Sequence, residues 1–180
     1  MKETILKGYK ALSKDMKAIF GNKMKYELNI WYKMRSNVHI IPCKQGYHFF
    51  DNIRDIFYLF YGHDYDIYEI EAKGNIIKDD DIHYKGKYVC SEIKLVKRLT
   101  QEEINKYIED NLDILVNDKE YEVRYEVARQ GYGLDILVND KDWYVRREVA
   151  RQGYGLDILV NDKDWRVRYE AQKQLKLQNK

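Results

Sequence analysis

The stretch RQGYGLDILVND occurs twice without a substitution, at Arg129–Asp140 and at Arg151–Asp162. When the C-terminal half of the chain is aligned on itself, this repetition extends to units of 22 residues. Self-similarity at a fixed period is the signature of stacked repeats, in which each unit packs mainly on its neighbours. The sequence therefore predicts a short all-α solenoid of three repeats, at residues 112–133, 134–155 and 156–177.

Each repeat is predicted to contain two helical pieces. The apolar residues of Leu134–Val138 fall at i, i+3 and i+4, which indicates one short helical turn. Asp142 is a suitable N-cap for a second helix, from about Trp143 to Gln152. Gly153 follows this helix, whereas a phosphate loop precedes one and presents N–H groups at the helix N-terminus. We therefore interpret the glycine as a helix stop in the left-handed conformation and not as a phosphate site.

Arg146 falls on the predicted buried side of the second helix. On a helical wheel of about 100° per residue, Arg146 lies between Val149 and Trp143, both assigned to the buried arc. An unpaired buried charge is costly, so this guanidinium needs a carboxylate. The expected partner is Asp140 or the equivalent aspartate of an adjacent repeat. The sequence thus predicts an internal ladder made of Asp118, Asp140, Asp162, Arg124, Arg146 and Arg168.

The opposite arc of the second helix is predicted to face outward. Glu148 recurs in every repeat on this arc and can pair with Arg151, three residues later. Two further positions differ between the repeats, and tyrosine and arginine predominate there. These residue types are typical of protein interfaces, so we predict a partner-binding surface, with an ordinary solvated face as the alternative. Its residues are Glu122, Tyr125, Tyr144, Arg147, Arg166 and Tyr169.

The ends of a repeat stack need covers. The third repeat ends in AQKQLKL, which is more polar than VARQGYG and lacks its glycines, so we predict a C-terminal cap. At the other end, Thr100 and Glu103 form a capping box that predicts a linking or capping helix over residues 100–111. Net charge changes from +5 over residues 1–99 to −3 over residues 100–180, and we place a domain boundary between them.

Residues 1–99 are predicted to form a small α+β domain. KYELNIW (25–31), DIYEIEAKG (66–74) and YVCSEIKLVKRL (88–99) have the alternation or the β-branched and aromatic content of strands. DNIRDIFYLFYG (51–62) has helical spacing, with Asp51 as the expected N-cap and Gly62 as the stop.

Both halves of the chain resemble known families. ILKGYKALSKDM, PCKQGYHFF, IYEIEAKGNII and SEIKLVKRL resemble a small α+β domain common in phage and prophage proteins. That resemblance implies a mobile-element setting and no particular activity. The Leu/Val turn and the D-x-D/E-W/Y-x-V-R start of the second helix resemble HEAT-like and leucine-rich-repeat-variant α-solenoids. That resemblance implies a binding or assembly surface.

The leading hypothesis is therefore a non-enzymatic, cytoplasmic protein-interaction module. The phage-like domain suggests that the protein partner is a bacterial defence or regulatory complex, such as a CRISPR effector, which the chain would inhibit. This step rests on analogy with the setting of the family and not on chemistry.

Two alternatives remain open at this point. The G-Y-H-F strand and the YEIEAKG strand resemble those of ADP-ribosyltransferases, with Tyr47, His48 and either Glu69 or Glu71 in catalytic positions. However, both glutamates alternate with apolar residues, as outward positions of a half-buried strand do. The second alternative is nucleic-acid binding by the basic N-terminal domain, through Lys7, Lys10, Lys14, Lys17 and the interleaved Tyr9.

Other classes find no support in the sequence. The first twenty residues have no apolar stretch of the kind found in signal peptides, and no run is long enough to span a membrane. Cys43 and Cys90 are expected to be reduced thiols. His39 and His48 flank Cys43 without forming a metal-binding motif, and we expect neither a metal nor a cofactor.

Overall fold

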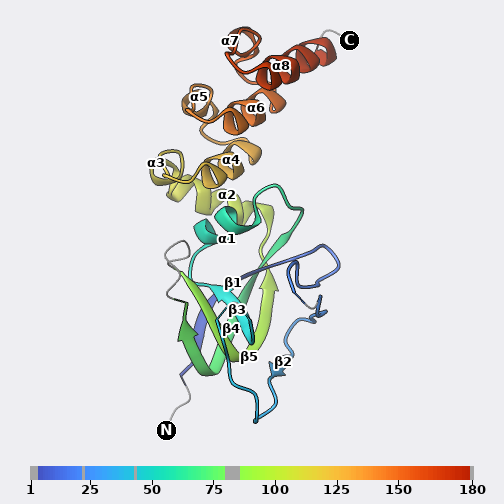
Figure 1. Ribbon diagram of the computed structural model, residues 1–180, viewed down its shortest axis with the longest axis vertical. Helices are drawn as coiled ribbons and strands as arrows, with labels where there is room; N and C mark the ends of the chain where they lie inside the picture. Colours follow the sequence, from blue (N-terminus) through green and yellow to red (C-terminus); the bar gives the residue numbers. More distant parts are fainter. Residues whose placement is uncertain (1–3, 22, 43, 80–85, 179–180) are drawn as a thin grey trace. The chain divides into compact units, whose positions relative to one another are not determined.

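The structure, a computed structural model, describes residues 4–21, 23–42, 44–79 and 86–178. The chain divides into two compact units, Met1–Gln101 and Glu102–Lys180. This division falls two residues beyond the boundary predicted between residues 99 and 100. The first unit contains a β-sheet and a helix, and the second is helical, so an α+β unit precedes a helical one (Figure 1).

The first unit is built on one antiparallel sheet. Its elements are β1 (Leu6–Leu12), β2 (Trp31–Lys33), β3 (Tyr47–Phe50), α1 (Ile53–Phe60), β4 (Asp66–Lys78) and β5 (Lys87–Arg98). The strand order is β2-β5-β3-β1-β4, and β5 also pairs with β4. The sheet therefore closes on itself, because β5 pairs with β4 along one edge and with β3 and β2 along the other.

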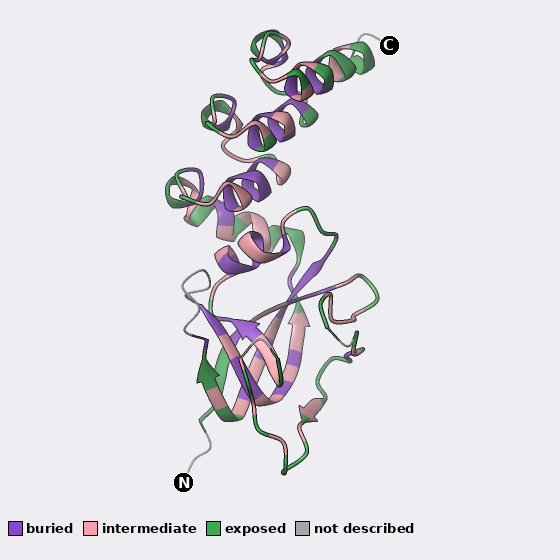
Figure 2. Cartoon of the chain, viewed as in Figure 1, coloured by how far each residue is buried: buried purple, intermediate pink, exposed green. Residues whose placement is uncertain are grey.

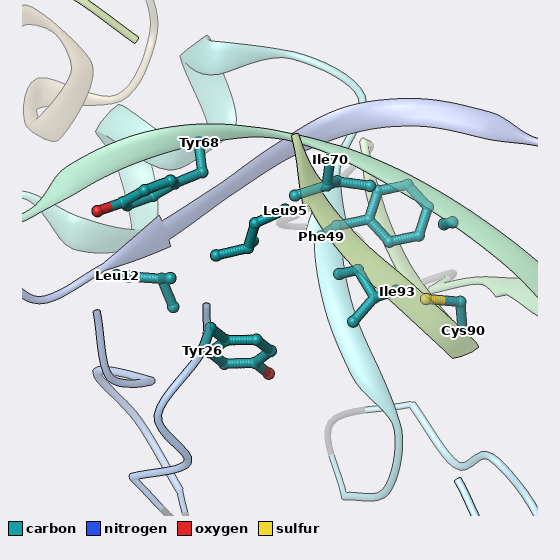
Figure 3. Close-up of a cluster of buried hydrophobic side chains, with 9 residues drawn as sticks. Leu12, Tyr26, Phe49, Tyr68, Ile70, Cys90, Ile93 and Leu95 are labelled. Carbon is teal, nitrogen blue, oxygen red and sulfur yellow. The ribbon is translucent and has the colours of Figure 1, made fainter. Parts of the chain in front are cut away.

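The core of the first unit lies on the inner face of this sheet. Figure 3 shows side chains of β1, β3, β4 and β5 converging there, with Tyr26 on the side opposite Tyr68 and Ile70. Tyr26 comes from the irregular segment before β2 and is 3 % exposed. Other members of the cluster are fully buried, namely Leu12, Phe49, Ala72, Cys90, Ile93 and Leu95.

The strand predicted over residues 25–31 is mostly wrong. Only Trp31 belongs to a strand, while Lys25 and Leu28 form isolated bridges. Asn29 has a φ of +62°, which interrupts an extended strand. In addition, the ring of Tyr26 fills the core from this segment. The strand-like alternation of residues 25–31 therefore does not reflect a strand. It reflects one buried ring, Tyr26, in an irregular segment.

The predicted N-cap of α1 is also wrong by one residue. Asn52 takes this position, and its side-chain oxygen accepts a hydrogen bond from the Asp55 N–H at 2.9 Å. Asp51 lies one residue earlier, where its own N–H donates to the Gly86 carbonyl at 2.9 Å. Either residue type suits a helix N-terminus, so the tertiary contact with Gly86 determines which of them caps.

The second unit consists of short and long helices in alternation. Its helices are α2 (Gln101–Asp110), α3 (Leu112–Leu115), α4 (Tyr121–Arg129), α5 (Leu134–Leu137), α6 (Trp143–Arg151), α7 (Leu156–Leu159) and α8 (Trp165–Gln178). From α3 onward they form three successive pairs (Figure 1). Figure 2 shows that the long helix of each pair, α4, α6 and α8, contains a buried stretch. Positions 22 residues apart are at most 1 % exposed, namely Leu115, Leu137, Leu159, Val123, Val145 and Val167.

The ends of α6 confirm two predictions. The Asp142 side chain caps the helix by accepting a hydrogen bond from the Tyr144 N–H at 2.8 Å. Gly153, with a φ of +78°, follows the helix in the left-handed conformation. Its N–H donates to the Ala150 carbonyl at 2.9 Å, and the next N–H closes the Schellman pattern. The helix ends at Arg151, one residue earlier than predicted.

The aspartate–arginine ladder joins each repeat to the next. Arg146 is 4 % exposed, and its Nε and Nη2 donate to the two carboxylate oxygens of Asp162 at 2.6 and 2.8 Å. Its Nη1 donates to the Asp140 carbonyl of its own repeat at 2.8 Å. Arg124 binds the Asp140 carboxylate in the same way, at 2.6 and 2.9 Å. Of the two partners proposed from the sequence, the aspartate of the following repeat is therefore the correct one.

Breaking one of these bridges should destabilise the second unit strongly. Arg146→Ala leaves the Asp162 carboxylate, 7 % exposed, without its guanidinium. We expect a loss of about 3 kcal/mol in the free energy of unfolding, measured by urea denaturation. The control is Lys106→Ala, which removes the exposed ion pair with Asp110 and should cost less than about 0.5 kcal/mol. Equal effects of the two changes would contradict an essential role for the ladder.

The two glycines of one turn should respond differently to alanine. Gly131 and Gly133 have φ angles of +83° and +60°, so alanine is strained at both, by about 1 kcal/mol. A Cβ at Gly133 would also lie 2.5 Å from Val116 Cγ1, whereas one at Gly131 would meet nothing within 4 Å. Gly133→Ala should therefore lower the urea midpoint clearly more than Gly131→Ala. The same loss in both variants would show that backbone strain alone matters.

Candidate functional site

An aromatic residue opens each long helix of the repeats, and its ring lies at the surface. Trp143 was assigned to the buried arc, and this is wrong, because it is only partly buried. Its ring lies between the Tyr144 ring, at 3.7 Å, and the Arg166 guanidinium, whose Cζ is 3.5 Å from the ring centroid. Trp143 therefore packs against a cation of the following repeat and not in the apolar core.

Where a repeat follows, it covers the ring with the residue at the first variable position, which is Tyr144 in the second repeat and Arg166 in the third. The Tyr121 ring stacks with Tyr144 at 5.8 Å, as the Trp143 ring stacks with Arg166. Trp165 occupies the same place in the third repeat, where no described residue covers its ring in this way, and it is 63 % exposed. Tyr144 is 36 % exposed and Arg166 is partly exposed, so both stay accessible from the side.

In the first repeat, the second variable position faces the following repeat and does not point outward. Tyr125 is 8 % exposed, so the prediction that it faces outward is wrong. Burial raises the pKa of its hydroxyl, and the Glu148 carboxylate of the following repeat raises it further. Tyr169, at the same position of the third repeat, is 63 % exposed. The difference follows from the stack, because only Tyr125 has a neighbour to cover it.

Arg147 and Glu122 complete the predicted surface. The Arg147 guanidinium lies over the rings of Trp143 and Tyr144, 5.4 and 5.6 Å from their centroids. Its Nε is buried without a hydrogen-bond partner among the described residues. Glu122 is partly buried, and burial, followed by the nearby Glu120 and Asp142 carboxylates, raises its pKa. Arg147 thus belongs to the aromatic surface, while Glu122 lies partly withdrawn from it.

The recurring glutamate was predicted on the outer arc, and this is wrong. Glu148 is 1 % exposed and Glu126 is fully buried. The predicted pairing is confirmed, because Glu148 accepts a hydrogen bond from Arg151 at 2.7 Å and Glu126 accepts one from Arg129 at 2.7 Å. A carboxylate that bonds to an arginine at the rim can be buried between repeats at an acceptable cost.

The third repeat leaves one side of α8 without the contacts that the earlier repeats make. We call Trp165, Arg168 and Tyr169 the end face, since they lie at i, i+3 and i+4 on one side of the helix. Arg168 Nη1 donates to the Asp162 and Lys163 carbonyls at 2.7 and 3.0 Å, as in the ladder. Among the residues that the structure describes, no carboxylate pairs with Arg168.

The residues proposed for a transferase are not assembled into one site. Tyr47 and His48 lie on β3, whereas the two glutamates lie on β4. Glu71 pairs with Lys94 at 2.6 Å and Glu69 with Lys97 at 3.4 Å, across the β4–β5 pairing. His48 lines a cavity to which neither glutamate contributes. This arrangement does not favour the transferase alternative.

The basic residues near the N-terminus are mostly engaged within the first unit. Lys14 pairs with Asp66 at 2.7 Å and with Asp64 at 3.3 Å, and Lys17 pairs with Asp15. The Lys10 ammonium donates to the His48 carbonyl at 2.6 Å. Lys7 is exposed on β1, and Tyr9 is partly exposed beside it. Because neighbouring carboxylates offset two of these charges, the arrangement does not favour a phosphate-binding surface.

The described residues contain neither a grouped set of metal ligands nor a membrane-spanning helix. There, no three histidine, cysteine or acidic side chains are grouped so that they could hold a metal ion. Cys43 lies outside the described residues. Cys90 is buried, its thiol donates to the Tyr47 carbonyl at 3.4 Å, and burial raises its pKa to about 12. None of the described helices combines the length and the apolar character needed to cross a membrane.

His48 should make the first unit sensitive to acid. Burial, and then the nearby Lys10 and Lys87, lower the pKa of His48 to about 4, whereas an unfolded histidine titrates near 6.5. The unfolded chain therefore binds the proton first, and stability is lost as the pH falls from about 6.5 to 4. Between pH 7 and about 4.5 these pKa values correspond to about 2 kcal/mol. Because His48 is partly exposed and solvent screens its charge, wild type should lose roughly 1 kcal/mol more than His48→Gln.

The measurement needs a reporter in the first unit alone. Trp31 supplies it when Trp143 and Trp165 are changed to phenylalanine, because these are the three tryptophans of the chain. Urea unfolding followed by Trp31 fluorescence then gives the free energy at each pH. His63→Gln removes an exposed histidine of the same unit and should behave as wild type does. Parallel curves for wild type and His48→Gln would contradict the assignment.

Comparison with known proteins identifies the first unit by family. The family described as Domain of unknown function (DUF7666) matches residues 6–107, which is more than half of the chain. No curated protein and no solved structure matches the chain significantly. The family match ends within α2, before the first repeat begins at Leu112. The chain belongs to the family defined by the domain of unknown function DUF7666.

Proposed function

We propose that the second unit is a short α-solenoid that binds another protein, and that the chain acts as a non-enzymatic interaction module. Two observations support the solenoid. Equivalent positions of the three helix pairs are buried to the same extent, and each pair is joined to the next by the same arginine–aspartate bridge. Repeats that pack only on their neighbours make extended binding surfaces.

The end face carries the proposal. Trp165 and Tyr169 are each 63 % exposed, and Arg168 lies between them on the same side of α8. Tryptophan, tyrosine and arginine are the residues that contribute most binding energy in protein interfaces. Large exposed rings beside a cation without a carboxylate are typical of a surface that a partner covers.

The contacts between repeats indicate which partner chemistry fits this end face. In the second repeat, the arginine equivalent to Arg168 holds an aspartate, and the tryptophan equivalent to Trp165 holds an arginine. Those two groups, Asp162 and Arg166, lie four residues apart in one segment. Asp140 and Tyr144 stand in the same relation to the first repeat. The partner segment should therefore carry a carboxylate, followed four residues later by an arginine or an aromatic residue.

The residues predicted from the sequence divide into two groups around this end face. Tyr169 belongs to it, while Tyr144, Arg147 and Arg166 form a lateral surface that a larger partner would also contact. Glu122 and Tyr125 are withdrawn or buried and should contribute little. That the partner is a bacterial defence complex stays a prediction from the resemblance of the first unit.

Selection from random peptides tests the partner chemistry directly. Ribosome display against the immobilised full chain should enrich segments with a carboxylate and, four residues later, arginine or tyrosine. Binding of the selected peptides, measured by fluorescence anisotropy, should weaken about tenfold or more in Trp165→Ala and in Arg168→Met. Trp165 is exposed and Arg168 has no carboxylate partner among the described residues, so neither change leaves a charge buried without its counter-charge, and the fold should be retained.

Tyr154→Ala is the matched control for this experiment. Tyr154 is 42 % exposed but precedes α7 and lies outside the end face, so its loss should change the affinity by less than about twofold. Selected peptides without the acidic residue, or binding that survives both end-face changes, would contradict the proposal.

A further inference from the structure

The first unit contains a cavity that the proposed function does not use. Its volume is about 580 Å³, within the range of sites that hold small organic molecules. It lies between β1, β3, the end of α1 and the irregular segments on both sides of β2. Six of its lining residues carry the inference, namely Lys10, Phe20, Tyr26, Tyr47, His48 and Phe60.

The cavity opens where two strands stop pairing. β1 and β3 pair only at Tyr9 and Phe50, although both strands continue. Beyond this pair, the His48 carbonyl accepts a hydrogen bond from the Lys10 ammonium at 2.6 Å in place of a backbone N–H of β1. The Lys10 side chain thus occupies part of the gap between β1 and β3, where backbone pairing has ended.

Lys10 is a partly buried cation that lines the cavity. Among the described residues, no carboxylate pairs with it, and no aspartate or glutamate lines the cavity. Its ammonium lies over the Tyr26 ring, 5.5 Å from the centroid. Burial lowers its pKa to about 8, so the amine is still mostly protonated at pH 7. An anion beside such a partly desolvated ammonium would form a charge-assisted hydrogen bond with it.

His48 also lines the cavity and carries a second polar atom close behind the wall. Its Nε2 is buried and has no hydrogen-bond partner among the described residues. Each unsatisfied buried group of this kind needs an explanation, and a bound molecule is one. The remaining wall is largely apolar and aromatic. Phe20, 52 % exposed, stacks on Phe60 with ring centroids 5.2 Å apart. A few polar groups in an apolar, ring-lined cavity are typical of a small-molecule site.

We propose that this cavity binds a small aromatic organic acid. The acidic group would lie against the Lys10 ammonium, beside the His48 side chain, and the planar body would pack among the rings of Phe20, Tyr26 and Phe60. A carboxylate and a phosphate share this chemistry. The site lies wholly in the first unit, so it is independent of the partner surface proposed for the second unit.

Three naphthalene probes distinguish the contribution of the acidic group to binding from that of the aromatic ring. They are 2-naphthoate, 2-naphthyl phosphate and the neutral 2-naphthamide, titrated into the full chain and followed by amide chemical shifts and calorimetry. At pH 7 at least one acid should bind about tenfold or more tightly than the amide, with shifts at cavity residues such as Gly46. The stronger of the two acids identifies the acidic group. Equal affinity for acid and amide, or no cavity shifts up to about 5 mM, would overturn the proposal.

Lys10→Met removes the cation and keeps the length of the side chain. It should abolish the preference for the acid and leave 2-naphthamide binding unchanged. Ala18→Phe fills the cavity from its wall and should abolish binding of all three probes, which keeps the test decisive if Lys10→Met does not fold. Acid binding that survives both changes would place the site elsewhere.

A pH titration of wild type gives an independent measurement. Affinity for the acid should fall about fivefold or more from pH 7 to about 9.5, as Lys10 loses its proton. The titratable groups that face Lys10 or the cavity are Tyr26, Lys44, Tyr47, His48, Lys87 and Cys90. Burial raises the pKa values of Tyr26, Tyr47 and Cys90, and His48 is already neutral at pH 7. A pH-independent affinity would overturn the role of Lys10.

Discussion

A buried guanidinium that can be satisfied only by the next repeat organises the second unit. Arg146 closes its own turn through the Asp140 carbonyl and at the same time clamps the Asp162 carboxylate of its neighbour. Neither charge is tolerable in the interior alone, because removing one partner leaves the other desolvated. Each repeat thus needs its neighbour to neutralise its buried arginine. Arg124 and Arg146 each bind an aspartate of the next repeat, whereas Arg168, the last arginine, bonds only to backbone carbonyls.

The first unit presents the opposite situation. There, a partly buried lysine donates to a backbone carbonyl but has no carboxylate partner among the described residues, and the closed sheet leaves space beside it. The two unmatched cations, Arg168 and Lys10, differ in form: one lies on an accessible helix face and the other in a walled cavity. Planar exposed rings suit a macromolecule, whereas an enclosed apolar volume suits a small one. The contrast gives each unit its own candidate ligand.

The sequence correctly predicted features that depend on the local backbone or on a single helix. Its predictions failed where contacts with neighbouring elements determine whether a residue is buried or in a strand. The repeat period, the Gly153 stop, the Asp142 cap and the burial of Arg146 all follow from local rules. Tyr125, Trp143 and Glu148 were misplaced because a helical wheel has only an inside and an outside. In a stack, a third direction points toward the neighbouring repeats, and these side chains lie along it. In the first unit, the buried ring of Tyr26 and the positive φ of Asn29 imitated a strand.

Because both junctions between repeats use the same arginine–aspartate bridge, repeats can be added or removed without changing how neighbouring repeats are joined. A duplication or loss of 22 residues in the middle of the stack would create no new interface and would leave α2 and the end face unchanged. Copy number could therefore change the length of the lateral surface in steps of one repeat while the terminal arginine and tryptophan are kept.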